Sequence, residues 1–516
     1  MVSKTWRTTA VAAVVSLGLA GCAGSGATSS GPSSPGSAAR TKEGALARVA
    51  TFDIAASGGE VKATVHPLVR SHEHLVLTVD LVAATLPDGA DAISTDWFDA
   101  DTTGAASGGA AFRIIDPSTR EIHLPASDAD GDLVGEPTSG SLWVTRSGLR
   151  LQRVYAAPED PETDLGLLMP GHYVDDMPIV DAKVPEPTDP DVEPVDLDVV
   201  AQAPVLPLES FTRQLDGAVQ VAESIDKVEI SLSGDVLFAT GSHKLTKAAA
   251  RLIDAAGATL ASHSGGVIEV VGHTDDVGDD ASNRALSERR AKAVADALRA
   301  DLDTSAYELK TTGRGEAEPY VANDSDANRQ LNRRVVLTLT SEQTKPVNVR
   351  TDGALPPFEG GPVATGAKGF QLTSSAGTFR VTAPAARRVD GMLEVSIEAT
   401  RTDKGEYEVG WVLNLAAGAW TYRGEDTAAG LFPFGPGLVV GTSVVYPLDY
   451  NLGTNKSGDQ EWRIAGPAEG RAGAAGEQTL RFTALYPDIP GATSITIDNA
   501  TSASGTSFRL TDVPVE

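Results

Sequence analysis

The chain has 516 residues, with 70 acidic and 42 basic side chains and a formal net charge of −28 at pH 7. This acidity argues against nucleic acid as a partner, because phosphate binding requires basic patches. The single cysteine excludes an intrachain disulfide. The length predicts about three domains.

The N-terminal residues indicate an export signal followed by a lipid attachment site. An uncharged apolar run from Ala10 to Ala20 follows two basic residues and is too short for a membrane span. Leu19-Ala20-Gly21-Cys22 resembles the lipobox of bacterial lipoproteins, so residues 1–21 would be removed and Cys22 would carry the lipid. The alternative is a plain signal peptide with a chance cysteine. Residues 22–47, rich in Gly, Ser, Ala, Thr and Pro, predict a flexible tether. We therefore expect an extracytoplasmic chain that is lipid-anchored to the cell membrane.

Residues 48–184 alternate between short strand-like segments and clusters of Gly, Asp and Pro. This pattern predicts an all-β sandwich of the immunoglobulin type. The strand-like segments are Val61–Val65, Leu75–Val82, Phe112–Ile115, Leu142–Thr145 and Leu149–Tyr155. A Pro- and acid-rich segment, residues 185–207, follows and predicts an extended, semi-rigid linker.

Candidate metal and catalytic chemistry in this region is sparse. His72-Glu73-His74 would place two imidazoles on one face of a strand without a third ligand, so we prefer a surface patch. Asp128, Asp130, Asp132 and Glu136 resemble a calcium loop, but Gly131 breaks the ligand register, which favours an acidic turn. The chain also contains no nucleophile elbow, no His-Glu-x-x-His and no phosphate loop. We predict no metal, no cofactor and no enzyme activity.

The most informative segment runs from Val267 to Arg290. A β-branched apolar run ends at Gly272-His273-Thr274-Asp275, and a polar loop then leads into a predicted helix over Asn283–Arg299. Arg290 shares the inward-facing apolar stripe of that helix. A charge on the buried side needs a partner or a ligand, and Asp275 is the natural candidate. The two residues therefore form either a structural ion pair or a site that grips a zwitterion.

Residues 228–339 resemble the OmpA/MotB-type peptidoglycan-binding domain. Four motifs carry the resemblance, in order: Val236-Leu237-Phe238 opening a strand; Gly272-His273-Thr274-Asp275; Asn283 with Leu286-Ser287 and Arg290-Ala291; and Gly313-Arg314-Gly315-Glu316 followed by Pro319, Asn323, Arg329 and Asn332-Arg333-Arg334-Val335. The resemblance implies a central α/β domain over residues 208–342, with a βαβαβ sheet and two helices. We expect those helices near Leu245–Leu260 and Asn283–Arg299.

The family's ligand is the diaminopimelate residue of the peptidoglycan stem peptide. By motif position, Asp275 would accept the ligand ammonium and Arg290 would bind the carboxylate, since a guanidinium fork matches a carboxylate with two hydrogen bonds. The resemblance adds Thr274, Asn283 and Arg329 to the pocket, and Asn332 and Arg333 at the start of the last strand beside it. Arg333 would serve structure as much as binding.

Two positions depart from the family pattern. Ala239-Thr240-Gly241 follows Phe238 where an acidic residue is common, which puts a ligand contact from this loop in doubt. Asn328 replaces the usual Gly before the Arg of the last loop, and Asn tolerates a left-handed backbone better than most residues.

The C-terminal part consists of a second linker, residues 343–369, and a second strand-rich region, residues 370–516. This region resembles the first one in sequence. The matched segments are Val61–Asp80 with Phe379–Glu398, Leu151–Tyr155 with Phe482–Tyr486, and Tyr173–Pro178 with Phe508–Pro514. We therefore predict a duplicated immunoglobulin-like sandwich, to which the sequence assigns no activity.

Together these features predict a cell-envelope lipoprotein that binds peptidoglycan non-covalently and tethers the membrane to the wall. Lipid and wall would hold the chain jointly, by effective concentration. The alternative is a surface interaction protein whose sandwiches bind a protein partner, with wall binding only for localisation. A helper subunit of a wall hydrolase is a weaker alternative.

Overall fold

The computed structural model describes residues 49–516 except 57–58, 95–110, 136–142, 189–192, 301, 304, 342–353, 375, 405–407, 412, 414–435, 455–459, 467–470, 475 and 500–506. The predicted signal peptide, Cys22 and the tether lie outside the described residues. Residues 44–516 belong to one compact unit. Within the described ranges, no helix combines the length and the apolar character that crossing a membrane requires.

The first strand-rich region forms two sheets around one core. The first sheet holds, in spatial order, β1 (Ala50–Ala56), β2 (Gly59–Val65), β4 (His74–Thr85), β3 (Leu68–Ser71) and β12 (Ile179–Val180), with β9 (Leu149–Ala156) beside β4. The second holds β11 (His172–Met177), β10 (Leu165–Met169), β6 (Arg113–Asp116), β7 (Glu121–His123) and β13 (Val205–Pro207). A small sheet pairs β5 (Ala92–Ser94) with β8 (Trp143–Thr145). Buried side chains from both larger sheets, such as Val61, Leu77 and Leu167, form one hydrophobic cluster, which confirms the predicted all-β region.

The second strand-rich region is built in the same way. One sheet holds β21 (Phe370–Ser374), β22 (Gly377–Thr382), β24 (Met392–Arg401) and β23 (Ala386–Val389), with β31 (Thr479–Pro487) beside β24. Facing strands are β27 (Ser443–Val445), β26 (Gly437–Val440), β32 (Ser494–Asn499), β33 (Phe508–Pro514) and β20 (Val363–Thr365). Two ribbons pair β25 (Glu408–Trp411) with β30 (Arg471–Ala474) and β28 (Asp449–Thr454) with β29 (Gln460–Ile464).

The strand orders of the two β regions agree with the predicted repeat. The order β1-β2-β4-β3 recurs as β21-β22-β24-β23, and the order β11-β10-β6-β7 recurs as β33-β32-β26-β27. Each copy has a bulge at the same place in its last hairpin. Each also has an aspartate with positive φ near its end, Asp176 (51°) and Asp512 (54°). Agreement at such irregular positions is stronger evidence of a repeat than shared strands alone.

The segment that the sequence predicts as a linker packs on the first β region. Four buried residues of that region, Val76, Ala126, Val134 and Val154, pack against Val195, Leu197, Val200 and Ala203 of this segment, and against Val184 just before it. Polar contacts add to this, because Gln152 donates to the carbonyl of Pro185 at 3.0 Å and Arg150 donates to that of Glu186 at 2.9 Å. The apolar side chains between the prolines therefore find a partner surface, which composition alone did not show.

The central region is an α/β sheet, as predicted, with more strands than the predicted βαβαβ unit. Its chain order is β16 (Lys227–Ser233), α1 (Gly234–Leu237), α2 (Lys247–Ala261), β17 (Gly266–His273), α3 (Asp280–Leu298), β18 (Tyr307–Gly315), α4 (Asp326–Asn332) and β19 (Arg334–Thr340). The spatial order is β18-β17-β19-β16, continued by β15 (Val219–Glu223) and β14 (Ser210–Gln214). β14 then pairs with β27, so the sheet runs on into the second β copy.

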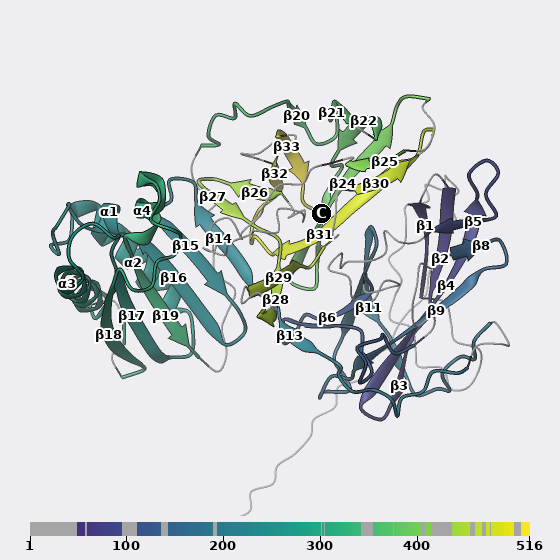
Figure 1. Ribbon diagram of the computed structural model, residues 1–516, viewed down its shortest axis with the longest axis horizontal. Helices are drawn as coiled ribbons and strands as arrows, with labels where there is room; N and C mark the ends of the chain where they lie inside the picture. The colour runs from purple at the N-terminus through teal and green to yellow at the C-terminus, as the bar shows by residue number, and fades with distance from the viewer. Residues whose placement is uncertain are drawn as a thin grey trace, which may run out of the picture. The chain divides into compact units, whose positions relative to one another are not determined.

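Helices α2 and α3 cover one face of this sheet (Figure 1). Their inward side chains, including Ile253, Leu260, Val294 and Leu298, share a cluster with Ile268 and Leu337 from the strands. Both long helices therefore lie where the sequence predicts them. The helical stripe that contains Arg290 does face the interior.

Two segment predictions were wrong. Val236-Leu237-Phe238 does not open a strand: β16 ends at Ser233 and the one-turn helix α1 follows. The backbone forms a single helical turn there, closed by the amide of Phe238, which donates to the carbonyl of Gly234 at 2.8 Å. Asn332 and Arg333 likewise precede the last strand, since α4 ends at Asn332. Asn328 lies inside α4 and needs no left-handed conformation.

Candidate ligand-binding site

Glycines in two of the motifs let α3 approach the sheet closely. Gly272 of β17 is paired with Gly313 of β18. A Cβ added at Gly272 would lie 2.2 Å from the carbonyl oxygen of Ser287, and one at Gly313 would lie 2.3 Å from the amide nitrogen of Glu288. The hydroxyl of Ser287 also accepts from the amide of Gly315 at 2.9 Å. The backbone of α3 therefore rests on both strands just before Arg290.

Arg290 is a buried cation, 4% exposed. Its Nε donates to the carbonyl of Ser242 at 2.9 Å, and its guanidinium carbon lies 5.1 Å from the ring centre of Phe238. Burial lowers the pKa of Arg290, and the charges of Asp235 and Asp275 act in the opposite direction. Both of these aspartates are paired with Arg333 instead. Arg290 is thus a buried positive charge that makes no ion pair with a carboxylate of the described residues.

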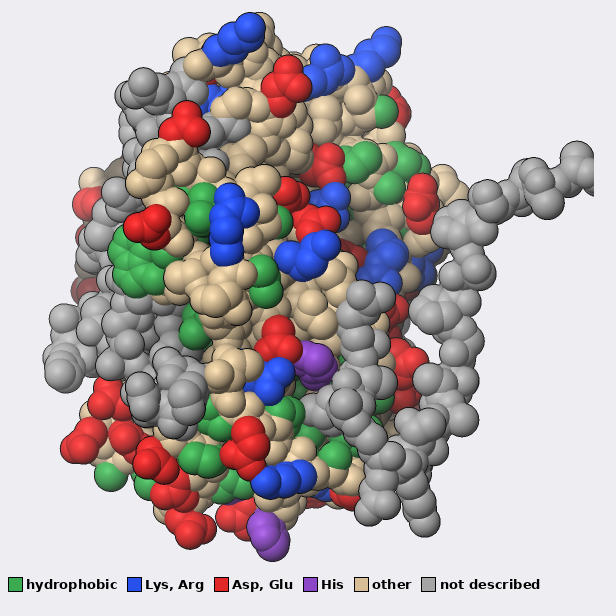
Figure 2. Space-filling view, turned by 90° about the vertical axis from the view of Figure 1, so that its right-hand side faces the viewer, with side chains coloured by type: hydrophobic (Ala, Val, Ile, Leu, Met, Phe, Trp, Pro, Cys, Tyr) green, Lys and Arg blue, Asp and Glu red, His purple; other side chains and the backbone are tan. Residues whose placement is uncertain are grey.

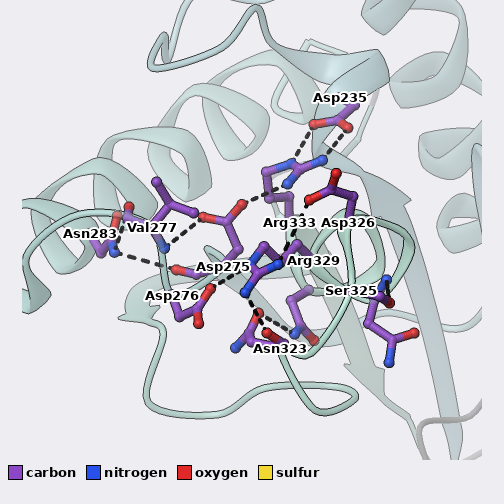
Figure 3. Close-up of polar contacts among 12 residues, drawn as sticks. Asp235, Asp275, Asp276, Val277, Asn283, Asn323, Ser325, Asp326, Arg329 and Arg333 are labelled. Carbon is purple, nitrogen blue, oxygen red and sulfur yellow. Dashed lines mark hydrogen bonds and ion pairs between the residues drawn. The ribbon is translucent and has the colours of Figure 1, made fainter.

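Asp275 pairs with Arg333, and the structural Asp275–Arg290 pair considered above does not form. Nη1 of Arg333 donates to Oδ2 of Asp275 at 2.6 Å (Figure 3). The same guanidinium makes two bonds to Asp235, at 2.8 and 2.7 Å. These contacts, those to Asp235 first, raise the pKa of Arg333. Oδ1 of Asp275 accepts only a long bond, 3.3 Å, from the amide of Val277.

Asn283 and Arg329 brace the loops around Asp275. The amide nitrogen of the buried Asn283 side chain donates to Glu316 at 2.7 Å and to the carbonyls of Asp275 and Val277 at 3.3 Å. Arg329 donates to Asp276 at 2.8 Å and to the carbonyl of Asn323 at 2.6 Å (Figure 3). The contact with Asp276 raises the pKa of Arg329. Both residues therefore connect segments that follow different strands.

Asn332 shapes the loop before α4. Its Oδ1 accepts from the amides of Tyr320 and Val321 at 2.7 and 3.0 Å, and its Nδ2 donates to Val321 and Asn323 at 2.8 Å. An Asn side chain has two donors and two acceptor lone pairs, so these four bonds use its full capacity. Asn332 is fully buried and holds the loop.

The Thr274 side chain can make a hydrogen bond that the described part of the structure does not contain. Its amide donates to the carbonyl of Gly315 at 2.9 Å, which fixes the loop. Its hydroxyl oxygen is buried without a hydrogen-bond partner among the described residues. Since buried polar atoms are nearly always paired, this hydroxyl is free to bond to a ligand or a water.

Sequence reasoning missed Asp235, which holds Arg333 with two bonds. Asp235 lies in α1, directly before the Val236-Leu237-Phe238 motif, and 98 residues from its partner. The only local signal was an acidic residue beside a motif, which is common on any surface. Phe238, in contrast, was singled out by the motif, and it contacts Arg290.

Comparison with known proteins places these residues in a family. Residues 237–333 match the model of the OmpA family. The lipoprotein YfiB of Escherichia coli (strain K12) is 33% identical over 138 residues, which cover 26% of this chain and 86% of that protein. The outer-membrane lipoprotein YfiB of Pseudomonas aeruginosa is 31% identical over 114 residues, covering 22% and 67%. The solved cell wall anchor of the T6SS from Pseudomonas aeruginosa is 28% identical, covering 24% and 89%, with a TM-score of 0.22.

The matched residues include Asp275, Arg290 and the glycines that seat α3, whereas both β copies lie outside the match. Through its central domain, the chain belongs to the OmpA family.

Proposed function

We propose that this chain binds peptidoglycan non-covalently, through the diaminopimelate residue of stem peptides, and so tethers the membrane to the wall. The observation that carries the proposal is Arg290, a buried guanidinium whose neighbouring carboxylates are paired elsewhere. A buried charge without an ionic partner is costly, and a ligand carboxylate would supply that partner. Membership of the OmpA family, and relatives that are named lipoproteins, support an envelope role.

In the proposed complex, the two ends of a zwitterion contact two residues. The ligand carboxylate binds the Arg290 fork, and the ligand ammonium donates to Asp275. The unpaired hydroxyl of Thr274 lies next to Asp275 in sequence and bonds to the same ligand. Asn283, Arg329, Asn332 and Arg333 keep the surrounding loops in place. Recognition of this kind needs a preformed site and involves no turnover.

The remaining parts of the chain act as anchor and spacers in this proposal. Cys22 carries the lipid, and residues 22–47 span the distance from the membrane to the first domain. The β copies, at 48–184 and 370–516, are immunoglobulin-like spacers that flank the central domain at 208–342 in sequence. Residues 185–207, which pack on the first copy, and residues 343–369 connect them to it. On the face that Figure 2 shows, apolar side chains are interspersed with charged ones, as on a solvated surface.

The test is co-sedimentation of the full chain with purified diaminopimelate-type sacculi. Asp275→Asn removes the ammonium acceptor and changes the side chain little in size. Asp254→Asn, on the exposed side of α2, is the matched control. We expect wild type and the control to sediment with the sacculi and Asp275→Asn to bind more weakly.

A wild-type chain that stays in the supernatant would reject wall binding. Equal sedimentation of all three proteins would reject this site and leave wall binding in place.

A further inference from the structure

We propose that the site selects its ligand chiefly by the free carboxylate and only secondarily by the ammonium, because Arg333 already supplies a cation to Asp275. The inference rests on the proposed function and adds a rank order between the two charged groups of the ligand. It also gives Arg333 a defined role, that of an internal substitute for the ligand ammonium.

The ammonium acceptor is already paired in the unliganded chain. Arg333 donates to Oδ2 of Asp275 at 2.6 Å, and two bonds to Asp235 hold the guanidinium in this position (Figure 3). Asp275 keeps Oδ1 for a ligand, where the amide of Val277 makes only a 3.3 Å contact. A ligand without an ammonium therefore leaves no newly unpaired carboxylate, since Arg333 stays in place.

Arg290, which would bind the ligand carboxylate, has no ionic partner among the described residues. Among the described residues, Arg290 makes one hydrogen bond, from Nε to the carbonyl of Ser242, and a ring contact with Phe238. It is 4% exposed before any ligand arrives. A ligand without a carboxylate would cover the remaining guanidinium donors and give them no anion. Leaving a buried charge unpaired costs more than forgoing an additional ion pair at a carboxylate that is already paired.

The charges also predict how the two ligand groups cooperate. Asp235, Asp275 and Arg333 together carry one net negative charge, which the nearby Arg290 balances. A ligand carboxylate neutralises Arg290 and leaves that negative charge for the ammonium. The ammonium therefore contributes mainly after the carboxylate has bound.

Competition between four synthetic tripeptides and sacculi for the full chain measures this order. The tripeptides share L-alanine and γ-linked D-glutamate and differ in the third residue. In the first peptide the third residue is diaminopimelate, and in the second its free-end carboxylate is replaced by a carboxamide. The third peptide has 2-aminopimelate, which lacks the free-end amine, and the fourth has lysine, which lacks the free-end carboxylate.

We expect the carboxamide and lysine peptides to compete at least about thirtyfold more weakly than the diaminopimelate peptide. This is the size of effect expected when a buried charge, here Arg290, loses its ionic partner. The 2-aminopimelate peptide should lose less than about fivefold, because the largely buried Asp275 carboxylate keeps its ion pair with Arg333 when the ligand ammonium is missing.

The outcomes separate the inference from the function on which it rests. If the diaminopimelate peptide competes and the 2-aminopimelate peptide is as weak as the lysine peptide or weaker, the rank order is refuted and the ligand class stands. If none of the four competes, the ligand class fails and the inference fails with it.

Arg333→Gln tests the role of the internal cation directly. Without Arg333, Asp275 depends on the ligand ammonium, so the penalty of the 2-aminopimelate peptide relative to diaminopimelate should grow several-fold. A merely structural role would weaken both peptides by the same factor. Arg289→Gln, on the exposed side of α3, keeps the wild-type ratio. An unchanged ratio in Arg333→Gln, with the variant still binding diaminopimelate, would refute the substitute role.

Discussion

Replacing Arg290 by Met should weaken wall binding strongly at little cost in stability. Met keeps an unbranched apolar stem against Phe238 and can make a sulfur–aromatic contact in place of the present guanidinium contact at 5.1 Å. The substitution removes the 2.9 Å bond to the carbonyl of Ser242, which costs about 1.5–3 kcal/mol for a charged donor. It also removes the cost of burying a charge without an ionic partner, a term of similar size and opposite sign.

The two terms nearly cancel, so we expect the free energy of unfolding of the central domain to change by less than about 1.5 kcal/mol. Binding should fall by about 2–5 kcal/mol, at least about thirtyfold, because the ligand carboxylate loses its guanidinium. A buried group that contributes little to stability and much to binding is typical of a functional site.

Sacculus co-sedimentation measures the affinity. Urea unfolding, monitored by amide hydrogen exchange in β17, measures the stability of the central domain. Arg289→Met is the matched control, because residue 289 lies on the exposed side of the same helix. Binding by Arg290→Met within threefold of the control would refute the assignment of Arg290 as carboxylate ligand. Unfolding of the domain by this substitution would instead refute the estimate that the two stability terms cancel.

Three further predictions follow from single residues. Asn332→Ala leaves the half-buried amides of Tyr320 and Val321 without acceptors. It should cost up to about 3 kcal/mol, and amide exchange should accelerate at both amides, whereas Asn332→Asp, which keeps the acceptor, should accelerate it less. Burial lowers the pKa of His273 from 6.5 to about 3, so the unfolded state binds one more proton than the folded state between these pH values. The free energy of unfolding should therefore fall as pH is lowered through this window, by up to about 1.4 kcal/mol per pH unit. If the urea midpoint of His273→Gln depended on pH as steeply as that of the wild type, this prediction would be contradicted. Cys22→Ser should abolish labelling of the chain by a fatty-acid probe in cells, and labelling that persists in this variant would argue against lipid attachment at Cys22.

Local patterns were sufficient for much of the fold. Alternating burial along β2 and the inward stripe of α3 were both readable from residue order, since period and amphipathicity are properties of one segment. The duplication was also visible in the sequence, because the two copies retain matching segments. The close approach of α3 to the motif glycines was known only from the structure.

Segment ends and polar partners were predicted less well. Val236-Leu237-Phe238 follows a strand and does not open one, because the end of β16 is set by its pairing with the distant strand β19, which stops at Ser233 and Arg334. The linker prediction missed a packed segment for a related reason. Pro-rich composition describes the free chain, whereas burial of Val195 and Leu197 depends on a surface formed elsewhere.

The sequence by itself determined the family motifs, the repeat and the candidate pair Asp275 and Arg290, because each depends on residue type at short spacing. Only the tertiary structure decided that Asp275 pairs with Arg333, 58 residues away, and that Asp235, 98 residues from Arg333, holds that guanidinium. Which of several charges pair is set by distance and burial after all elements have packed. Since a charge contributes the same pattern to the sequence whether it is paired or left for a ligand, that distinction exists only in the folded chain.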